Sequence, residues 1–595
     1  MKTASIFSAF NARWLEPEDV ARSFIPTLHF KSLVKFQHSL LMGPRGCGKT
    51  TLLKMLTRRA QKIWAGRLDK EPDLGEYPNP DFEAIYIASD IRWSEELGGI
   101  AKTLTNTPKL AEQMQRALVA ISSVVEATRV FQAIMVDDDA DPTELVKALI
   151  RYLDLGPTVP SFQELRLKLQ VWVDELHSYL ISDREDELSA RLVAIPPFLT
   201  GGAPVAVMRV CTIFDEYAPK SSPTKWAICF DELEIAPLWL QTELFRALRS
   251  TDQRFLLKLT WSPLLPSDLT TRQERQHDYA TIRMWHGHVL DAKPFCKEFS
   301  KKFIQDKFGN DTSLTPRNVF GSSPFSSEDI EHEDVYREGG AVWQAMVRLA
   351  AVDPSFKRYL IEHDIDPKNP VSDDVTIRDE SLRKIKPIVL LREAFFSHAQ
   401  YSRTFRRSRK NPNLYYGEDA IYAMSEGNPR LLASLLSDLL DLNAKSDITR
   451  NPKVRPVDQS RVLLAASQRS LAGIKAYPTK QRAPSKSLAR LVDRMGLFLH
   501  SELVIREFSP DPIGTFLVDP ELPKEILDEL TFGLLIGAFV HVKSHESDIP
   551  QSIVGSRIRL SYMLSPYYQL LFRNYRDIRL SVALRVVSAG QRSFF

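Results

Sequence analysis

The sequence has little cysteine, little net charge and no long apolar run, and each shortage excludes a class of protein. Its four cysteines lie far apart, without a Cys-x-x-Cys pair, which argues against a zinc site or a disulfide framework. The formal net charge is only +3 over 595 residues, so any contact with nucleic acid must come from local basic patches. No segment reaches the about 18 to 20 consecutive apolar residues that a membrane span requires.

The first residues also lack the features of a secretory signal. A single lysine at position 2 is followed by no apolar segment before residues 11–14. We therefore expect a cytoplasmic protein without membrane contact. The apolar share of 44% with 26% charged residues is typical of a globular protein, and the length predicts roughly three or four domains.

The most informative segment is a glycine-rich loop that follows a short apolar strand at 39–42 and precedes a helix at 49–56. Glycines let the backbone turn its N–H groups toward phosphate oxygens. Lys49 supplies a positive charge to the β- and γ-phosphates, and the Thr50 hydroxyl is a ligand for Mg²⁺. The sequence therefore predicts that ATP and Mg²⁺ bind here. The residues predicted to hold the nucleotide are Gly43, Pro44, Arg45, Gly46, Cys47, Gly48, Lys49, Thr50 and Thr51.

Further apolar segments predict a parallel sheet around this loop. Strands are expected at 84–88, 226–230, 255–260 and 281–285, each short and too apolar for a surface helix. Alternation of strands with helices indicates an α/β P-loop NTPase core. Residues from about 94 to 205 follow a helical periodicity instead, so we interpret them as a helical insertion.

Two carboxylates come directly after the apolar strand at 226–230. A carboxylate at such a strand end can join the Mg²⁺ shell, and the next one can lie beside the attacking water. We therefore assign Asp231 to the metal and Glu232 as the catalytic base. Glu234 is a weaker candidate, better explained as a solvated residue at the start of the following helix.

Residues 420–432 are predicted to form a helix, a turn and a second helix. Gly427 can take the left-handed position after the first helix, and Pro429 suits the first turn of the second. Arg430 then projects from the start of that helix. An ordinary helical corner is the alternative interpretation.

The C-terminal part of the sequence predicts a separate domain. Amphipathic helical patterns at 488–503 and 523–540 precede a strand-like segment at 557–562, and helices followed by a hairpin suggest a winged helix. We expect a nucleotide-binding domain at 1–300, a helical insertion and lid domain at 301–480, and a winged-helix-like domain at 481–595.

These motifs together resemble the AAA+ ATPases of the origin-recognition/initiator clade and the related STAND ATPases. The resemblance rests on residues 43–50, Asp231-Glu232, the polar strand end at 260–262, residues 427–430 and the C-terminal domain. It covers the motifs and their order, and it leaves out the insertions at about 94–205 and 300–395. Proteins of this build also occur among bacterial antiphage defence systems, which suggests such a role by analogy.

The resemblance implies roles for five further residues. Thr260 and Ser262 compete for the position of a γ-phosphate sensor at the end of a core strand. Arg272 and Arg275 are candidates for an arginine finger that reaches a neighbouring subunit, with a charged helix end as the alternative. Arg430 matches the lid arginine that links the lid angle to the bound nucleotide.

Two basic segments are candidates for DNA contact. Residues 401–410 carry five positive charges and no acid, with aromatic residues interleaved. Five arginines of the C-terminal domain could line one face of a winged helix; they are Arg557, Arg559, Arg573, Arg576 and Arg579. A solvated basic loop and a protein-binding module are the alternatives.

Two functional hypotheses follow from these motifs. In the first, the chain is a homo-oligomeric AAA+ switch or motor that hydrolyses ATP and acts on DNA or on a DNA-bound partner. In the second, it is a STAND-like scaffold that uses ATP to assemble with an effector protein and does not bind nucleic acid.

Overall fold

The structure is a computed structural model that describes most of the chain in two compact units. The described residues are 12, 14–69, 78–89, 91–181, 185–217, 225–248, 252, 254–265, 279–309, 314–325, 338–370, 375–396, 413–444, 453–477, 487–542 and 552–591. The N-terminal unit comprises the described residues of 11–43 and 48–284. The C-terminal unit comprises residues 44–47 and the described residues from 285 onward.

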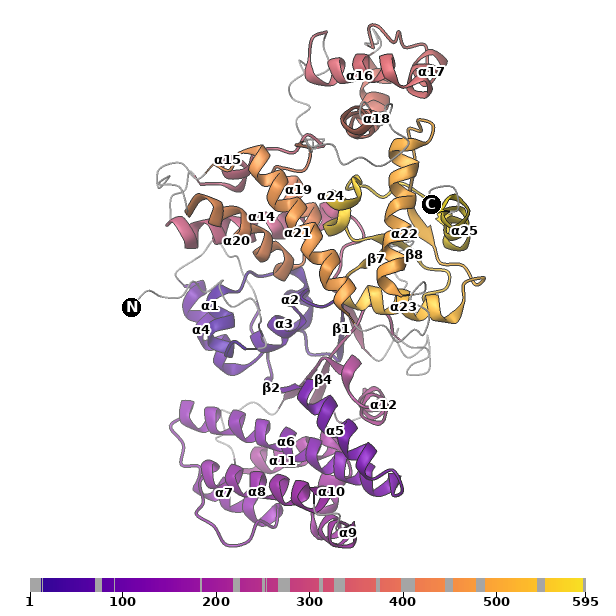
Figure 1. Cartoon of the computed structure of the whole chain (residues 1–595). Coiled ribbons are helices and arrows are strands. Elements are labelled where there is room, and N and C mark those ends of the chain that lie inside the picture. The colour runs from indigo at the N-terminus through magenta and orange to yellow at the C-terminus, as the bar shows by residue number, and fades with distance from the viewer. Residues whose placement is uncertain are drawn as a thin grey trace. The chain divides into compact units, whose positions relative to one another are not determined.

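The N-terminal unit is built on a five-stranded sheet in which every paired neighbour is parallel (Figure 1). The strand order is β2-β3-β4-β1-β5. This confirms the parallel sheet that the apolar segments predict. The strands are β1 (Ser39–Met42), β2 (Glu83–Ala88), β3 (Trp226–Asp231), β4 (Phe255–Trp261) and β5 (Ala280–Arg283).

Helices of the same unit flank the sheet, and one of them follows the glycine-rich loop. The helix α3 (Lys49–Met55) begins directly after the loop, as predicted. Burial of its apolar residues Leu52, Leu53 and Met55 fixes it to the sheet. The other helices here are α1 (Pro17–Ser23), α2 (Leu28–Leu33), α4 (Arg58–Leu68) and α12 (Leu238–Ala247), with a short 3₁₀ turn η3 (Leu233–Ile235) after β3.

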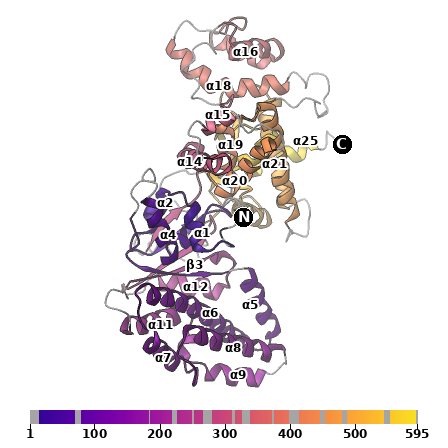
Figure 2. The same cartoon turned by 90° about the vertical axis from the view of Figure 1, so that its left-hand side faces the viewer.

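A helical bundle lies between β2 and β3 in the chain, where the periodicity predicts an insertion. In Figures 1 and 2 its helices α6, α7, α8 and α11 lie side by side. Phe131 of α6 stacks on Phe214 of α11 at 4.5 Å, and both meet the ring of Trp226 on β3, so the bundle and the sheet share one apolar core. The bundle helices are α5 (Ile91–Thr103), α6 (Pro108–Asp137), α7 (Thr143–Tyr152), α8 (Phe162–Ile181), α9 (Glu185–Ala194), α10 (Pro197–Thr200) and α11 (Ala203–Tyr217).

One helix of the described residues, α6, is long and apolar enough to cross a membrane by length and composition alone. Its most apolar window is 56% buried inside the protein. The core helix of a globular unit passes the same test.

The C-terminal unit begins with two groups of helices. The first group contains α14 (Val289–Phe308), α15 (Pro316–Phe320), α19 (Glu418–Ser425), α20 (Pro429–Ala444) and α21 (Pro456–Ala476). The second contains α16 (Ala341–Val352), α17 (Pro354–Glu362) and α18 (Val375–Phe396).

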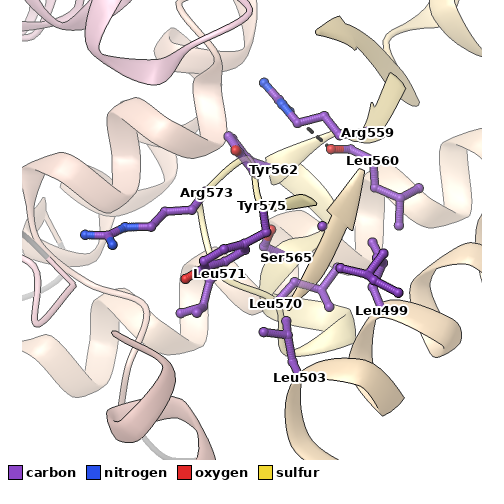
Figure 3. A pocket seen from close by; sticks show the side chains of 12 residues that line it. Leu499, Leu503, Arg559, Leu560, Tyr562, Ser565, Leu570, Leu571, Arg573 and Tyr575 are labelled. Atoms are coloured by element: carbon purple, nitrogen blue, oxygen red, sulfur yellow. Dashed lines mark hydrogen bonds between the residues drawn. The ribbon is translucent and has the colours of Figure 1, made fainter. Parts of the chain in front are cut away.

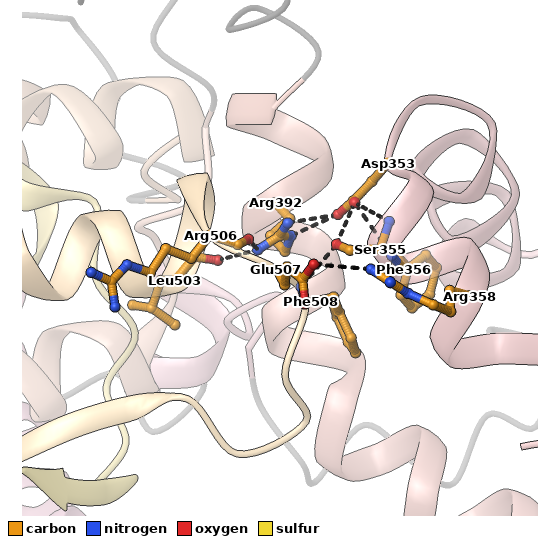
Figure 4. Close-up of polar contacts among 9 residues, drawn as sticks. All are labelled: Asp353, Ser355, Phe356, Arg358, Arg392, Leu503, Arg506, Glu507 and Phe508. Carbon is orange, nitrogen blue, oxygen red and sulfur yellow. Dashed lines mark hydrogen bonds and ion pairs between the residues drawn. The ribbon is translucent and has the colours of Figure 1, made fainter. Parts of the chain in front are cut away.

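A buried arginine, Arg392, joins two helices of the second group to each other through an ion pair and to the rest of the unit through hydrogen bonds (Figure 4). Arg392 of α18 bonds the Asp353 carboxylate through Nε and Nη2, at 2.9 and 2.7 Å. Its Nη1 donates to the carbonyls of Leu503 and Arg506, at the end of the π-helical turn η7 (Ser501–Ile505). The same guanidinium therefore satisfies the helix end and the N-cap carboxylate of α17.

A four-stranded sheet of order β7-β8-β6-β9 completes the C-terminal unit. β8 pairs antiparallel with β6 and β7, while β9 runs parallel to β6. The elements are α22 (Leu488–His500), β6 (Ile513–Leu517), α23 (Lys524–Ile536), β7 (Phe539–Val542), β8 (Arg557–Leu560), the 3₁₀ turn η8 (Tyr562–Leu564), α24 (Ser565–Tyr568), β9 (Arg576–Arg579) and α25 (Leu580–Gln591). Helices beside an antiparallel β7–β8 pair are compatible with the winged helix, which stays a prediction, as do the domain boundaries at 300 and 480.

The prediction of a helix through residue 540 is wrong. α23 ends at Ile536 because Gly537 adopts a left-handed conformation with φ of 79°, and the next residues form β7. The pattern misled because the apolar residues continue on both sides of Gly537.

Candidate functional site

The glycine-rich loop has the backbone conformation that its glycines permit. Gly46 and Gly48 have φ of 84° and 99°, a region that other residues rarely adopt. The Gly43 N–H donates to the Trp261 carbonyl at 3.0 Å, so the pairing of β1 with β4 continues into the loop. Lys49 is 7% exposed, and its Nζ donates to the Gly43 carbonyl at 2.5 Å. The lysine therefore lies folded back along the loop.

Residues 44–47 of the loop belong to the C-terminal unit, where they contact the turn before α20. The Arg45 carbonyl accepts a hydrogen bond from Nδ2 of Asn428 at 3.0 Å. A Cβ on Gly46 would lie 3.0 Å from Asn428 Oδ1 and 3.1 Å from Cβ of Arg430. A larger residue at position 46 would therefore crowd the segment that carries Arg430.

Asp231 is the centre of a hydrogen-bond cluster at the carboxyl ends of the core strands. Its side chain is buried, with 3% of the residue exposed. Oδ2 accepts from Oγ1 of Thr50 at 2.6 Å and from the Tyr86 hydroxyl at 3.0 Å. Oδ1 accepts from Oγ1 of Thr260 at 2.8 Å and from the Glu232 N–H at 3.0 Å. Three segments far apart in the sequence thus meet at one carboxylate.

Glu232 follows β3 in a left-handed conformation, with φ of 56° and ψ of 43°. For a residue other than glycine this conformation is strained, and such strain is common at functional sites. The Glu232 N–H is held by Oγ1 of Thr260 at 2.7 Å as well as by Asp231. Asp231 and Thr260 therefore fix the backbone from which the predicted catalytic base projects.

Thr260 and Ser262 have different surroundings. Thr260 is fully buried beside Asp231. Oγ of Ser262 donates to the Leu264 carbonyl at 3.1 Å. The structure therefore brings Thr260 into the carboxylate cluster and shows Ser262 bonded within its own turn. Arg272 and Arg275 lie outside the described residues, as do the basic residues at 403–410.

Lys258, two residues before Thr260 on β4, fixes the chain that enters β1. Its side chain is fully buried, and Nζ donates to the carbonyls of Leu33, Lys35 and Gln37, each at 2.8 Å. Burial lowers the pKa of Lys258 to about 7. The three carbonyls favour the charged form, which opposes this shift.

The turn before α20 has the conformation that the sequence predicts at Gly427, whose φ is 71°. A Cβ there would come within 2.6 Å of Ala292 Cβ and 2.7 Å of His286 Cδ2, so only glycine fits. Asn428 Oδ1 accepts from the Arg430 N–H at 3.1 Å and caps the new helix. Pro429 and Arg430 are its first two residues.

Glu426 connects this turn to the C-terminal sheet. It ends α19 in a left-handed conformation with φ of 54°. Its carboxylate accepts from Nη1 of Arg559 at 2.5 Å and from the Tyr562 N–H at 2.8 Å. The Arg559 guanidinium also lies over the Tyr562 ring, 3.7 Å from its centroid.

The arginines of the C-terminal domain do not form one exposed face. Arg559 is 2% exposed and paired with Glu426, so the interpretation of this residue as a DNA contact is wrong. Nε of Arg557 donates to Oγ1 of Thr515 at 2.8 Å. Arg576 and Arg579 are exposed on β9.

A small pocket of the C-terminal unit is lined by none of the residues that are predicted to bind the nucleotide (Figure 3). Arg559 donates to the carbonyl of Leu560 beside it. Most of the lining is apolar, and it includes Leu499, Leu503, Tyr562, Leu570, Leu571 and Tyr575.

The parallel sheet, the loop and the carboxylate at the end of β3 define a P-loop NTPase. Among the residues that the structure describes, no three His, Cys, Asp or Glu side chains gather as a metal cluster. A Mg²⁺ ion would instead be held by the Thr50 hydroxyl, the Asp231 carboxylate and phosphate oxygens, a donor set that suits it.

The family model of ORC-CDC6-like proteins matches residues 5–580. The chain therefore belongs to the ORC-CDC6-like family. Membership of this family makes it an AAA+ initiator-like ATPase. AAA+ ATPases of this kind act with ATP and Mg²⁺. No curated protein matches the chain.

Sequence reasoning missed Tyr86 and Glu426. Tyr86 is one residue of an apolar strand, and its hydroxyl contacts Asp231 across 145 positions of sequence. Glu426 contacts Arg559 across 133 positions. Neither partner could be identified without the sheet register and the packing of the helices.

Proposed function

We propose that the chain is an ATP-hydrolysing AAA+ switch or motor that assembles into a homo-oligomer and acts on DNA or on a DNA-bound partner. The observation that carries the hydrolytic part is the cluster around Asp231, in which Thr50 lies 2.6 Å from Oδ2 and Thr260 lies 2.8 Å from Oδ1. P-loop NTPases hold Mg²⁺ with a hydroxyl of the loop and a carboxylate at a strand end, and this cluster joins Thr50 at the start of α3 to Asp231 at the end of β3.

In this proposal each residue of the site has one task. The N–H groups of the loop and the Lys49 ammonium bind the phosphates, and Thr50 and Asp231 hold Mg²⁺, which neutralises charge on the phosphates when it is bound. Glu232 takes a proton from the attacking water. Thr260 lies beside Asp231 and Glu232 and would sense the γ-phosphate.

The lid arginine and the finger complete the proposed site. Arg430 would contact the γ-phosphate, so that hydrolysis changes the balance between lid conformations. Arg272 or Arg275 would act from a neighbouring subunit, because an added cation stabilises the charge that develops in the transition state. An oligomer is therefore part of the proposal.

The second candidate is a STAND-like scaffold that uses ATP to assemble with an effector protein. The burial of Arg559 favours it, because the C-terminal domain then offers fewer arginines to phosphates. A role in antiphage defence is proposed with either candidate, by analogy of build alone.

A DNA-binding measurement with and without ATP distinguishes the two candidates. If the protein acts on DNA, duplexes of unrelated sequence should shift in a gel with similar affinity. With about four phosphate contacts, raising the salt concentration from 50 to 200 mM should weaken binding on the order of 10²-fold. Replacing the exposed pair Arg576 and Arg579 with alanine should lower this affinity, whereas Arg585→Ala, which breaks an exposed pair with Glu521, serves as the control.

ATP-dependent assembly in sedimentation, together with no duplex shift at the lower salt concentration, would contradict action on DNA and would support the scaffold.

A further inference from the structure

Tyr86 is a side chain of the sheet whose polar end reaches the proposed magnesium site. It lies on β2, and its register partner on β3 is Cys229. Side chains alternate along a strand, so position 231 faces the same side of the sheet as position 229. The phenol ring is long enough to span these two positions. Its hydroxyl therefore ends 3.0 Å from Oδ2 of Asp231.

The hydroxyl contacts the oxygen that also faces the loop. Oδ2 accepts from Thr50, the predicted magnesium ligand, at 2.6 Å. Oδ1 is occupied separately by Thr260 and by the Glu232 N–H. With donors on both oxygens, the buried carboxylate is held in one orientation. When the Thr50 hydroxyl turns its lone pair to a cation, the Tyr86 hydroxyl can still donate to Oδ2.

The ring is itself held from the helix that follows the glycine-rich loop. Nζ of Lys54 on α3 lies 5.4 Å from the centroid of the Tyr86 ring. The same ammonium donates to the carbonyls of Ala12 and Leu15 at 2.8 and 2.7 Å. The position of the ring therefore does not depend on the hydroxyl alone, and phenylalanine would keep the ring contact.

We propose that Tyr86 is a positioning residue of the magnesium–nucleotide site, and that its hydroxyl orients Asp231 so that Oδ2 is offered to the cation together with Thr50. This inference rests on the proposed function, because it assigns Asp231 to magnesium. Removing a group that hydrogen-bonds a metal ligand and orients it typically lowers the metal affinity by about 10- to 100-fold.

The test is the ratio of ADP affinities measured by calorimetry with and without Mg²⁺, which needs no turnover. Tyr86→Phe should bind ADP alone as the parent protein does and should lose about 10-fold of the affinity gained with Mg²⁺. In an Asp231→Asn background the same change should have no further effect, because Tyr86 acts through that carboxylate. Tyr152→Phe, which removes a partly exposed phenol on α7, is the control.

The results distinguish a failure of the role inferred for Tyr86 from a failure of the proposed function. If Asp231→Asn leaves the magnesium gain unchanged, the assignment of Asp231 fails and the proposed function with it. If Asp231→Asn removes the gain while Tyr86→Phe keeps it, the inference alone is overturned. An equal loss of ADP affinity with and without Mg²⁺ in Tyr86→Phe would show a structural role and would also overturn it.

Discussion

At the residue scale, the role of Asp231 could be predicted from the sequence, whereas that of Tyr86 could not. Asp231 was predictable because it closes an apolar strand in a chain that also has a glycine-rich loop. Tyr86 was not, because an aromatic residue in a strand is ordinary and its partner depends on the pairing of β2 with β3. The strained backbone of Glu232 was equally invisible, since sequence alone does not give φ for a glutamate.

Asp215 of α11 offers a prediction about pH at the residue scale. Its carboxylate accepts from Nε1 of Trp226 at 3.2 Å, and burial raises its pKa to about 6 from an ordinary value of 3.8. Ionisation therefore disfavours the fold, and the stabilisation present at low pH is lost as the pH rises through about 6. We expect Asp215→Asn to raise the free energy of unfolding by roughly 1 to 2 kcal/mol at about pH 7.5, a value discounted for partial hydration, and by little at about pH 4.

Urea unfolding at both pH values checks this prediction. Asp252→Asn is the control, because contact with Arg254 lowers the pKa of Asp252 and removing that charge should not stabilise the protein. A gain for Asp215→Asn that is the same at both pH values would contradict the account.

At the scale of elements, helices and strands with strong patterns were predictable and their ends were not. The core strands lie where the apolar segments predict them. α23 ends earlier than predicted because Gly537 breaks a run of apolar residues that continues into β7. The turn between α19 and α20 was predictable at Gly427, but its attachment to β8 through Glu426 and Arg559 was not.

Breaking that attachment should cost much more than breaking a surface pair. Arg559→Met leaves the Glu426 carboxylate, whose side chain is 11% exposed, without its cation. We expect a loss of about 3 to 5 kcal/mol in the free energy of unfolding, because an unpaired buried charge is strongly unfavourable. Adding Glu426→Gln should recover part of it.

The exposed pair of Arg585 with Glu521 is the matched comparison, with side chains 74% and 51% exposed. Arg585→Met should change stability by about 0 to 1 kcal/mol in the same urea titration. Equal effects of the two methionine variants would show that the Glu426–Arg559 contact does not hold the turn.

At the scale of the whole molecule, the family match extends over both helical insertions, which the motif resemblance left out. The motifs predicted an AAA+ ATPase because their chemistry is local, whereas the partner and the oligomer depend on surfaces that no motif specifies. The two candidates for the arginine finger, Arg272 and Arg275, lie outside the described residues.

Subunit mixing tests the shared site. Glu232→Gln subunits lack the proposed base, and Arg272→Ala/Arg275→Ala subunits lack the proposed finger. Mixed oligomers should recover part of the ATPase activity that neither variant has alone, because some interfaces then join an intact base to an intact finger. Full activity of a monomer, or no recovery although both variants assemble, would contradict a finger that acts in trans.

ATP hydrolysis by the purified protein, compared with Glu232→Gln and Lys49→Ala, tests the central claim most directly. The parent protein should hydrolyse ATP in the presence of Mg²⁺. Glu232→Gln should bind ATP and hydrolyse it at least ~10²-fold more slowly, as expected for a lost general base. Lys49→Ala should lose binding or turnover, because it removes the ammonium that the proposal assigns to the β- and γ-phosphates. Undiminished hydrolysis by Lys49→Ala would contradict the assignment of the nucleotide site, and undiminished hydrolysis by Glu232→Gln would contradict the assignment of the base.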